Sequence, residues 1–291
     1  MCFIHIICIS FIKTHKDKKC LTNQKFNDIM KVGFCIYRLI IWKGDLKMIV
    51  DRSYKISAFG NFSSISATAE SLLYYLEAFK KYGLVPSIYQ ELSMQNGAIQ
   101  PFPVQRIALV SADNKEKITI GLNRIDYEII ASDDIKISCD KMEEYNSRII
   151  DSFELILKAA NLSASRLALN AEALVINLSQ QELDLFLAKY TNPISLFEPQ
   201  SMTEWSTRLV SRKSDFINGS SEDFNVIAII QKTSLQKQVN GQVELSNGFS
   251  ISIDINTIAE NTLARFEAVQ VEEFIKVSTN WYNTILREVG N

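Results

Sequence analysis

Residues 249–256 read Phe-Ser-Ile-Ser-Ile-Asp-Ile-Asn, the most regular alternation of apolar and polar residues in the chain. Successive side chains of a strand point to opposite faces, so this period of two predicts a strand with one apolar face. The residues predicted to face a core are Phe249, Ile251, Ile253 and Ile255. Such a strand is typical of an antiparallel sheet that is covered on one face only.

Weaker patterns on either side predict the other elements. Alternating or apolar runs predict strands at 53–59, 87–93, 106–112, 116–121, 125–131, 166–178, 204–213 and 224–233. Apolar residues at helical spacing predict helices at 66–82, 140–161, 179–190 and 271–287. Gly83 would end the first helix, and Ser179 with Glu182 forms a capping box for the third. Asn-Gly pairs at 96–97, 240–241 and 247–248 predict loops.

The predicted elements repeat in order. Each half reads strand, helix, three strands and long helix, if the short strand at 87–93 is set aside. This order predicts an α+β protein with two related lobes, 48–161 and 162–291, each an antiparallel sheet covered by helices. The order of elements also suggests an internal duplication, although the two halves have no visible sequence similarity.

The first 47 residues differ from the rest. They hold both histidines and four of the five cysteines. The apolar run near Cys2 lacks the flanks of a targeting signal, and the spacing of the Cys and His residues fits no standard zinc pattern. Lys43-Gly44-Asp45 can be back-translated into a bacterial ribosome-binding sequence just before Met48. We therefore expect the native protein to begin at Met48 and residues 1–47 to be a mistranslated upstream segment outside the fold.

The composition of residues 48–291 disfavours several classes of function. They carry 22 Lys and Arg against 30 Asp and Glu, a formal net charge of −8, which disfavours a nucleic-acid-binding face. They contain no histidine and one cysteine, Cys139, which fits a reducing cytoplasm. No apolar run reaches the length of a membrane helix. We expect a cytoplasmic protein without a membrane segment.

Most catalytic devices are absent from the sequence. Without histidine, the commonest general base at neutral pH and every Ser-His or Cys-His arrangement are excluded from residues 48–291. Neither GxGxxG nor GxxxxGK[ST] occurs, so no phosphate loop is predicted. We predict no cofactor and no metal site. Cys139 has no base near it in the sequence and is typical of a buried, inert thiol.

The remaining candidates are carboxylates and arginines near the predicted strands. Asp113, Asp126 and Asp254 would form an acid/base pair only if they met in a cleft, and the alternation instead predicts a solvated polar face for Asp126 and Asp254. Arg106 and Arg124 are candidates for binding a carboxylate or phosphate. The alternative for both arginines is pairing with neighbouring acids of the sheet.

Three segments together resemble a known family. They are residues 106–127 (Arg-Ile-Ala-Leu-Val-Ser-Ala-Asp-Asn running into Ile-Thr-Ile-Gly-Leu-Asn-Arg-Ile-Asp-Tyr), the strand Ile-Ser-Ile-Asp-Ile-Asn at 251–256, and the last helix with Trp281 and Ile285. Over residues 85–288 the chain resembles a sporadically distributed prokaryotic protein family of unknown function, although it lacks that family's proline-rich opening. The resemblance implies an accessory gene of mobile-element or defence clusters. It supplies no catalytic residues.

Three functions remain open at this point. A non-catalytic protein-interaction or accessory protein explains the missing histidine and the many strands, whose edges offer backbone pairing to a partner. A carboxylate- or metal-dependent enzyme needs the acids to converge. A nucleic-acid accessory protein needs a basic patch that the net charge disfavours. The first is our expectation, with a protein partner or a second copy of the chain as its ligand.

Overall fold

Two strands from opposite halves of the sequence pair at the centre of the sheet. Strand β1 (Met48–Phe59) runs antiparallel to β8 (Arg166–Ile176), with Phe59 opposite Arg166. The structure is a computed structural model and describes residues 48–92, 94–95, 98–99, 103–131, 139, 142–191, 204–239 and 242–290. The predictions about residues 1–47, and the predicted turns at 96–97 and 240–241, lie outside the described residues.

The described residues form one sheet of nine strands in which every neighbouring pair is antiparallel. In spatial order the strands are β2 (Leu84–Glu91), β5 (Val104–Ser111), β6 (Glu116–Ile120), β7 (Arg124–Ile130), β1, β8, β11 (Gln242–Thr257), β10 (Ser220–Val239) and β9 (Ser206–Ile217). Two short strands, β3 (Met94–Gln95) and β4 (Ala98–Ile99), pair separately inside a segment that we predicted as a loop.

The α+β class is confirmed, but the prediction of a separate sheet in each half is wrong. The first half is ordered β1, β7, β6, β5, β2 outward from the centre, and the second β8, β11, β10, β9. Each half thus begins with a central strand, continues through a helix to an edge strand and returns toward the centre as a meander. Pairing of β1 with β8 joins the strands of the two halves into one sheet. A strand's own pattern predicts which face is buried and not which strand lies beside it.

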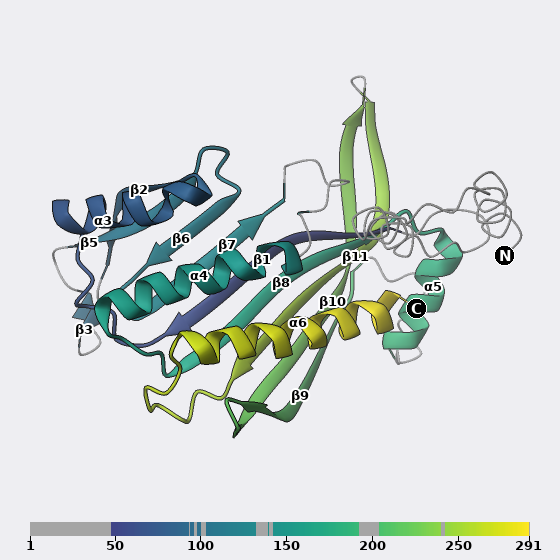
Figure 1. The fold of residues 1–291 in the computed structure, drawn as a ribbon. Coiled ribbons are helices and arrows are strands. Elements are labelled where there is room, and N and C mark those ends of the chain that lie inside the picture. The colour runs from purple at the N-terminus through teal and green to yellow at the C-terminus, as the bar shows by residue number, and fades with distance from the viewer. Residues whose placement is uncertain are drawn as a thin grey trace, which may run out of the picture. The chain divides into compact units, whose positions relative to one another are not determined.

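The helices pack on one face of the sheet (Figure 1). They are α3 (Ala69–Phe79), a 3₁₀ turn η1 (Lys80–Tyr82), α4 (Met142–Ala160), α5 (Gln180–Tyr190) and α6 (Ala268–Gly290). Helices α4 and α6 contact each other, and Thr279 Oγ1 lies 3.6 Å from Met142 Sδ. None of the described helices is long and apolar enough to cross a membrane.

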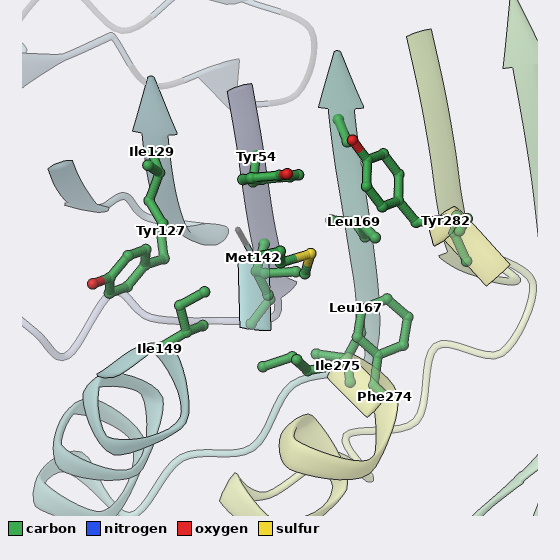
Figure 2. Packing of buried hydrophobic residues seen from close by; sticks show 14 of the residues in the cluster. Tyr54, Tyr127, Ile129, Met142, Ile149, Leu167, Leu169, Phe274, Ile275 and Tyr282 are labelled. Atoms are coloured by element: carbon green, nitrogen blue, oxygen red, sulfur yellow. The ribbon is translucent and has the colours of Figure 1, made fainter. Parts of the chain in front are cut away.

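One cluster of buried apolar side chains fills the space between sheet and helices. Figure 2 shows its centre, where strand residues Tyr54, Tyr127, Ile129, Leu167 and Leu169 meet helix residues Met142, Ile149, Phe274, Ile275 and Tyr282. The four apolar residues of β11 are buried in this cluster, as their alternation predicts. The core therefore spans both halves of the chain.

Two helix ends follow the predicted chemistry. Ser179 Oγ accepts the backbone N–H of Glu182, and the Glu182 side chain accepts the backbone N–H of Ser179, so the capping box of α5 is confirmed. Gly83 follows η1 with φ 70°, a left-handed conformation that glycine adopts at little cost. These local contacts need no information from distant residues, which explains why the sequence predicted them.

The connection between β10 and β11 is not the loop that its polar composition predicted. The two strands continue as a ribbon to Val239 and Gln242, so residues 247–248 lie within β11. Gly248 lies where β11 meets the end of β8, and a Cβ atom on it would collide with the backbone carbonyl oxygen of Val175. Glycine is needed there for close approach of two backbones, and not for a turn.

We expect Gly248→Ala to lower the free energy of unfolding by about 1–3 kcal/mol, the usual cost of inserting a methyl group into a packed site. The clashing atom belongs to backbone, so no side-chain rotation relieves it. Ser250→Ala is the matched control on the same strand, because the Ser250 hydroxyl is buried without a hydrogen-bond partner among the described residues. Urea unfolding compares the two variants. Equal stability of Gly248→Ala and wild type would contradict the close approach.

Candidate functional site

The face of the sheet opposite the helices presents mostly polar side chains. Residues that alternate with the core positions point to it, for example Lys55 on β1 and Asn170 on β8. The described helices lie on the other face (Figure 1). We call the surface of β7, β1, β8, β11 and β10 on this side the polar face.

The strand register arranges the polar face in rows across the sheet. In one row Glu128, Lys55, Asn170 and Asp254 stand directly opposite one another on β7, β1, β8 and β11. The next row contains Ser53, Glu172 and Ser252, and continues to Ile229 on β10. Directly opposed side chains in an antiparallel sheet lie about 5 Å apart, so each row is a line of hydrogen-bonding groups that ends at an isoleucine of β10.

These rows line a shallow hollow of about 280 Å³ at the centre of the sheet. Its charged groups are Lys55, Glu128, Glu172 and Asp254, one cation against three carboxylates. Ile227 and Ile229 form its apolar side on β10. The hollow therefore combines a net negative charge with the apolar surface of the two isoleucines.

Hydrogen bonds hold the neighbouring row in place. Ser57 Oγ donates to Asp126 at 2.6 Å, and Arg124 Nε lies 2.7 Å from the same carboxylate. Asn256 Nδ2 donates to Asp254 at 2.9 Å, and Asn256 Oδ1 accepts from Asn225 Nδ2 at 3.3 Å. Side chains that are already bonded to one another present fixed donors and acceptors to a partner.

The three candidate acids do not converge. Asp126 on β7 and Asp254 on β11 both lie on the polar face, but β1 and β8 separate them, so they are roughly 14 Å apart at the usual strand spacing. Asp113 lies in the turn between β5 and β6, where its carboxylate accepts from Ser111 Oγ at 2.7 Å and from the backbone N–H of Lys115 at 3.2 Å. These hydrogen bonds lower the pKa of Asp113. The geometry provides no acid/base pair among them.

The two candidate arginines differ in exposure. The Arg106 side chain is only 1% exposed and donates from Nη2 to the carbonyls of Phe62 (2.8 Å) and Gly121 (2.7 Å) and from Nε to that of Ile120 (3.3 Å). Burial lowers its pKa, while Glu91, 3.8 Å away, acts in the opposite direction. The Arg106 guanidinium, which the sequence predicted to bind a carboxylate or phosphate, is thus buried and bonded to three backbone carbonyls.

Arg124 is half exposed and paired with Asp126 on the polar face. The guanidinium also lies 5.9 Å from the centre of the Phe59 ring. Pairing with a neighbouring acid is the alternative that the sequence left open for this arginine. It remains accessible at the edge of the polar face.

Cys139 lies in the core beside a buried polar group that the sequence did not predict. The backbone N–H of Cys139 donates to the carbonyl of Asp51 at 2.9 Å, and Tyr282 Oη donates to the Asp51 carboxylate at 2.6 Å. Burial, with the nearby Asp51 carboxylate, raises the pKa of the Cys139 thiol to about 12. Burial also raises the pKa of Tyr54 and Tyr282. A thiol so protected from ionisation is a poor nucleophile.

A second buried network anchors α4 to the sheet. Glu116 on β6 pairs with Arg148 Nη2 of α4 at 2.7 Å and accepts a hydrogen bond from Tyr127 Oη. Burial raises the pKa of Glu116. Arg148 Nη2 also donates to the Tyr82 carbonyl at 3.0 Å, which ties in η1. Glu116 and Tyr127 are buried on the core side, so this network fixes the helix to the sheet.

Within the part of the chain that the structure describes, no group of three or more His, Cys, Asp or Glu side chains could hold a metal ion. Comparison of the chain with protein-family models, curated proteins and solved structures gave no match. The polar face is therefore characterised by its own geometry: a broad, shallow surface of fixed hydrogen-bonding groups.

Proposed function

We propose that the protein acts by binding a protein partner on the polar face and has no turnover of its own. The observation that carries this proposal is the shallow hollow across β7, β1, β8, β11 and β10, whose polar groups are spread in rows. Small-molecule sites are usually deep and built around a few converging polar groups. Protein interfaces instead bring many dispersed hydrogen bonds and a modest apolar area together.

The charges of the hollow indicate the kind of partner. Lys55 is accompanied by Glu128, Glu172 and Asp254, so a phosphate backbone would be repelled. A protein surface with basic or amide side chains complements these carboxylates. The same arrangement disfavours the alternative of a nucleic-acid accessory protein.

The enzyme alternative lacks a converging site among the described residues. Proton transfer without histidine needs a carboxylate, Lys or Tyr whose pKa is strongly shifted and which reaches the substrate. Glu116 and Tyr282, whose pKa values burial raises, lie under the helices. The exposed Lys81 and the half-buried Tyr82, whose pKa values are also raised, lie outside the hollow. The acids of the polar face are dispersed over several strands.

The proposal includes three further parts. We infer that the two halves arose by duplication, because each places its first strand at the centre and its next long strand at an edge. We also propose that the protein is cytoplasmic and has an accessory role in a prokaryotic mobile-element or defence gene cluster. Superposition of β1–α4 on β8–α6 tests the duplication, which fails if the equivalent strands do not overlay.

The test of the binding function is the triple variant Asp113→Asn, Asp126→Asn and Asp254→Asn in an assay that reports the gene's phenotype in its host. We expect the triple variant to fold normally and to keep the phenotype, because the amides preserve the size of the side chains, and Glu128 and Glu172 keep the hollow negative. Ser252→Arg, which fills the hollow without removing an acid, should lose the phenotype. Ser66→Arg, at an exposed loop position, is its matched control.

The enzyme alternative makes the opposite prediction. Loss of the phenotype in a folded triple variant, together with binding of a divalent metal ion by the wild type only, would replace the binding proposal. Metal content is measured on purified wild type and variant by mass spectrometry, and folding by circular dichroism. Retained phenotype in Ser252→Arg would show that the hollow does not contact the partner.

A further inference from the structure

Strand β9 forms one edge of the sheet, and no described residue pairs with its outer side. Nearly all of its side chains are exposed. Long, open edge strands are templates for pairing with another chain unless the protein protects them. The other edge, β2, contains Pro86, which lacks the N–H that a paired strand would need.

The pairing with β10 determines which backbone groups of β9 point outward. The backbone N–H of Lys232 donates to the carbonyl of Trp205 at 3.1 Å, so residues 205 and 232 are a hydrogen-bonded pair. Such pairs alternate along an antiparallel ladder, and the residues between them direct their N–H and C=O groups away from the partner strand. The even-numbered residues of β9, from Ser206 to Phe216, therefore point their backbone groups outward.

One of these outward groups is already protected. The Asp215 side chain accepts the backbone N–H of Phe216 at 2.8 Å. The open stretch therefore runs over Ser206, Arg208, Val210, Arg212 and Ser214.

The side chains of the open stretch continue the polar face. Arg208, Val210 and Arg212 stand directly opposite Ile229, Ile227 and Asn225 of β10. Arg212 Nη2 donates to Asn225 at 3.3 Å and lies 3.8 Å from the exposed Glu260. The edge thus presents an exposed apolar residue between two guanidinium groups, on the same side as the hollow.

We propose that the outer edge of β9 binds an extended acidic segment of the protein partner as a tenth strand. Opposed side chains on one face pair across strands. The segment would therefore carry an apolar residue with an acidic residue two positions before it and another two positions after it. Its acids would face Arg208 and Arg212, and its apolar residue would face Val210. This inference rests on the binding function proposed above and names the chemistry of one part of the partner.

A second copy of the chain fits this edge less well. In every two-fold register the residues opposite Arg208 and Arg212 come from the even-numbered residues 206–216 of the other copy, which include no acid. Pairing centred on Val210 even places Arg208 opposite Arg212. Like charges in direct opposition destabilise a strand pair. Charge complementarity therefore favours an acidic segment from another protein.

The test uses the intact protein and a short fluorescent peptide with a central valine, glutamates two places to either side of it and threonines elsewhere. We expect saturable binding by fluorescence anisotropy, and at least about tenfold weaker binding when lysines replace the glutamates. Two N-methylated peptides are compared, one methylated at the odd-numbered and one at the even-numbered peptide nitrogens. One pattern should abolish binding and the other should leave it nearly unchanged, because only alternate N–H groups face β9. Equal effects of the two methylation patterns would overturn the proposal that the peptide pairs with β9 as a strand.

Variants of the protein complete the test. Arg208→Glu with Arg212→Glu should reverse the preference toward the lysine peptide, and Val210→Pro, which removes an outward N–H and leaves the β10 ladder intact, should weaken binding at least about tenfold. A homodimer in solution that dissociates on Val210→Pro, or no binding up to about 1 mM peptide, overturns the proposal. The binding function itself is judged separately by Ser252→Arg, which leaves this edge unaltered.

Discussion

Ile253→Asp is expected to lower the free energy of unfolding by more than about 4 kcal/mol, because it places a carboxylate in the apolar core. Ile253 is 2% exposed and stands between Ala171 of β8 and Ala228 of β10, which are also buried. Because both neighbours are alanines, the isoleucine side chain fills most of the core space at this point of the sheet. Urea unfolding followed by circular dichroism measures the effect.

Ser252→Asp is the matched control, since it introduces the same carboxylate one residue earlier on the polar face. It lies opposite Glu172, so like-charge repulsion should cost no more than about 1 kcal/mol. If both variants unfolded at the same urea concentration, the inward face of β11 would be assigned wrongly. The comparison therefore tests the alternation and not only the tolerance of the strand.

Arg106→Ala is expected to cost about 3–5 kcal/mol, which is a large part of the stability of a typical domain. The change removes donors to the carbonyls of Phe62, Ile120 and Gly121 and leaves a space at a fully buried position. Lysine cannot restore the fork of donors, so Arg106→Lys should recover only part of the loss. Thermal and urea unfolding provide the measurement.

Arg124→Ala is the control, because Arg124 also lies on a strand but is exposed to solvent. Its guanidinium is half exposed and pairs with Asp126, so the expected cost is below about 1 kcal/mol. A ligand-binding role for Arg106 would predict the reverse pattern, with little loss of stability and a loss of binding. Equal stabilities of the two alanine variants would contradict the buried role assigned to Arg106.

The sequence predicted those features that depend on short-range patterns. The alternation at 249–256 is recovered as the buried face of β11, and Ser179 with Glu182 forms the predicted cap. Leu209 shows where the same reasoning ends: it stands opposite the buried Ala228 on the core side of the sheet, but it is 47% exposed, because its strand lies at the sheet edge. Period alone indicates a face and does not tell whether a helix covers it.

The features that the sequence missed depend on distant residues. Arg106 looked like a binding residue, since nothing nearby shows that the loop through Phe62 would bring carbonyls to its guanidinium. Glu116 and Arg148 come from a strand and a later helix, and only their packing pairs them. The polar ribbon of β10 and β11 was predicted as a loop, because strands that satisfy each other's hydrogen bonds need no apolar face.

The pairing of β1 with β8 has a consequence for the order of assembly during synthesis. Phe59 leaves the ribosome long before its partner Arg166, so β1 can pair with β7 while its other side stays open. Contacts so far apart in sequence form late and slow the acquisition of the native state. Until β8 arrives, the nascent chain exposes a strand rich in apolar residues that any other nascent copy can capture. A translation stalled between α4 and β8 would therefore leave one side of β1 open to such capture.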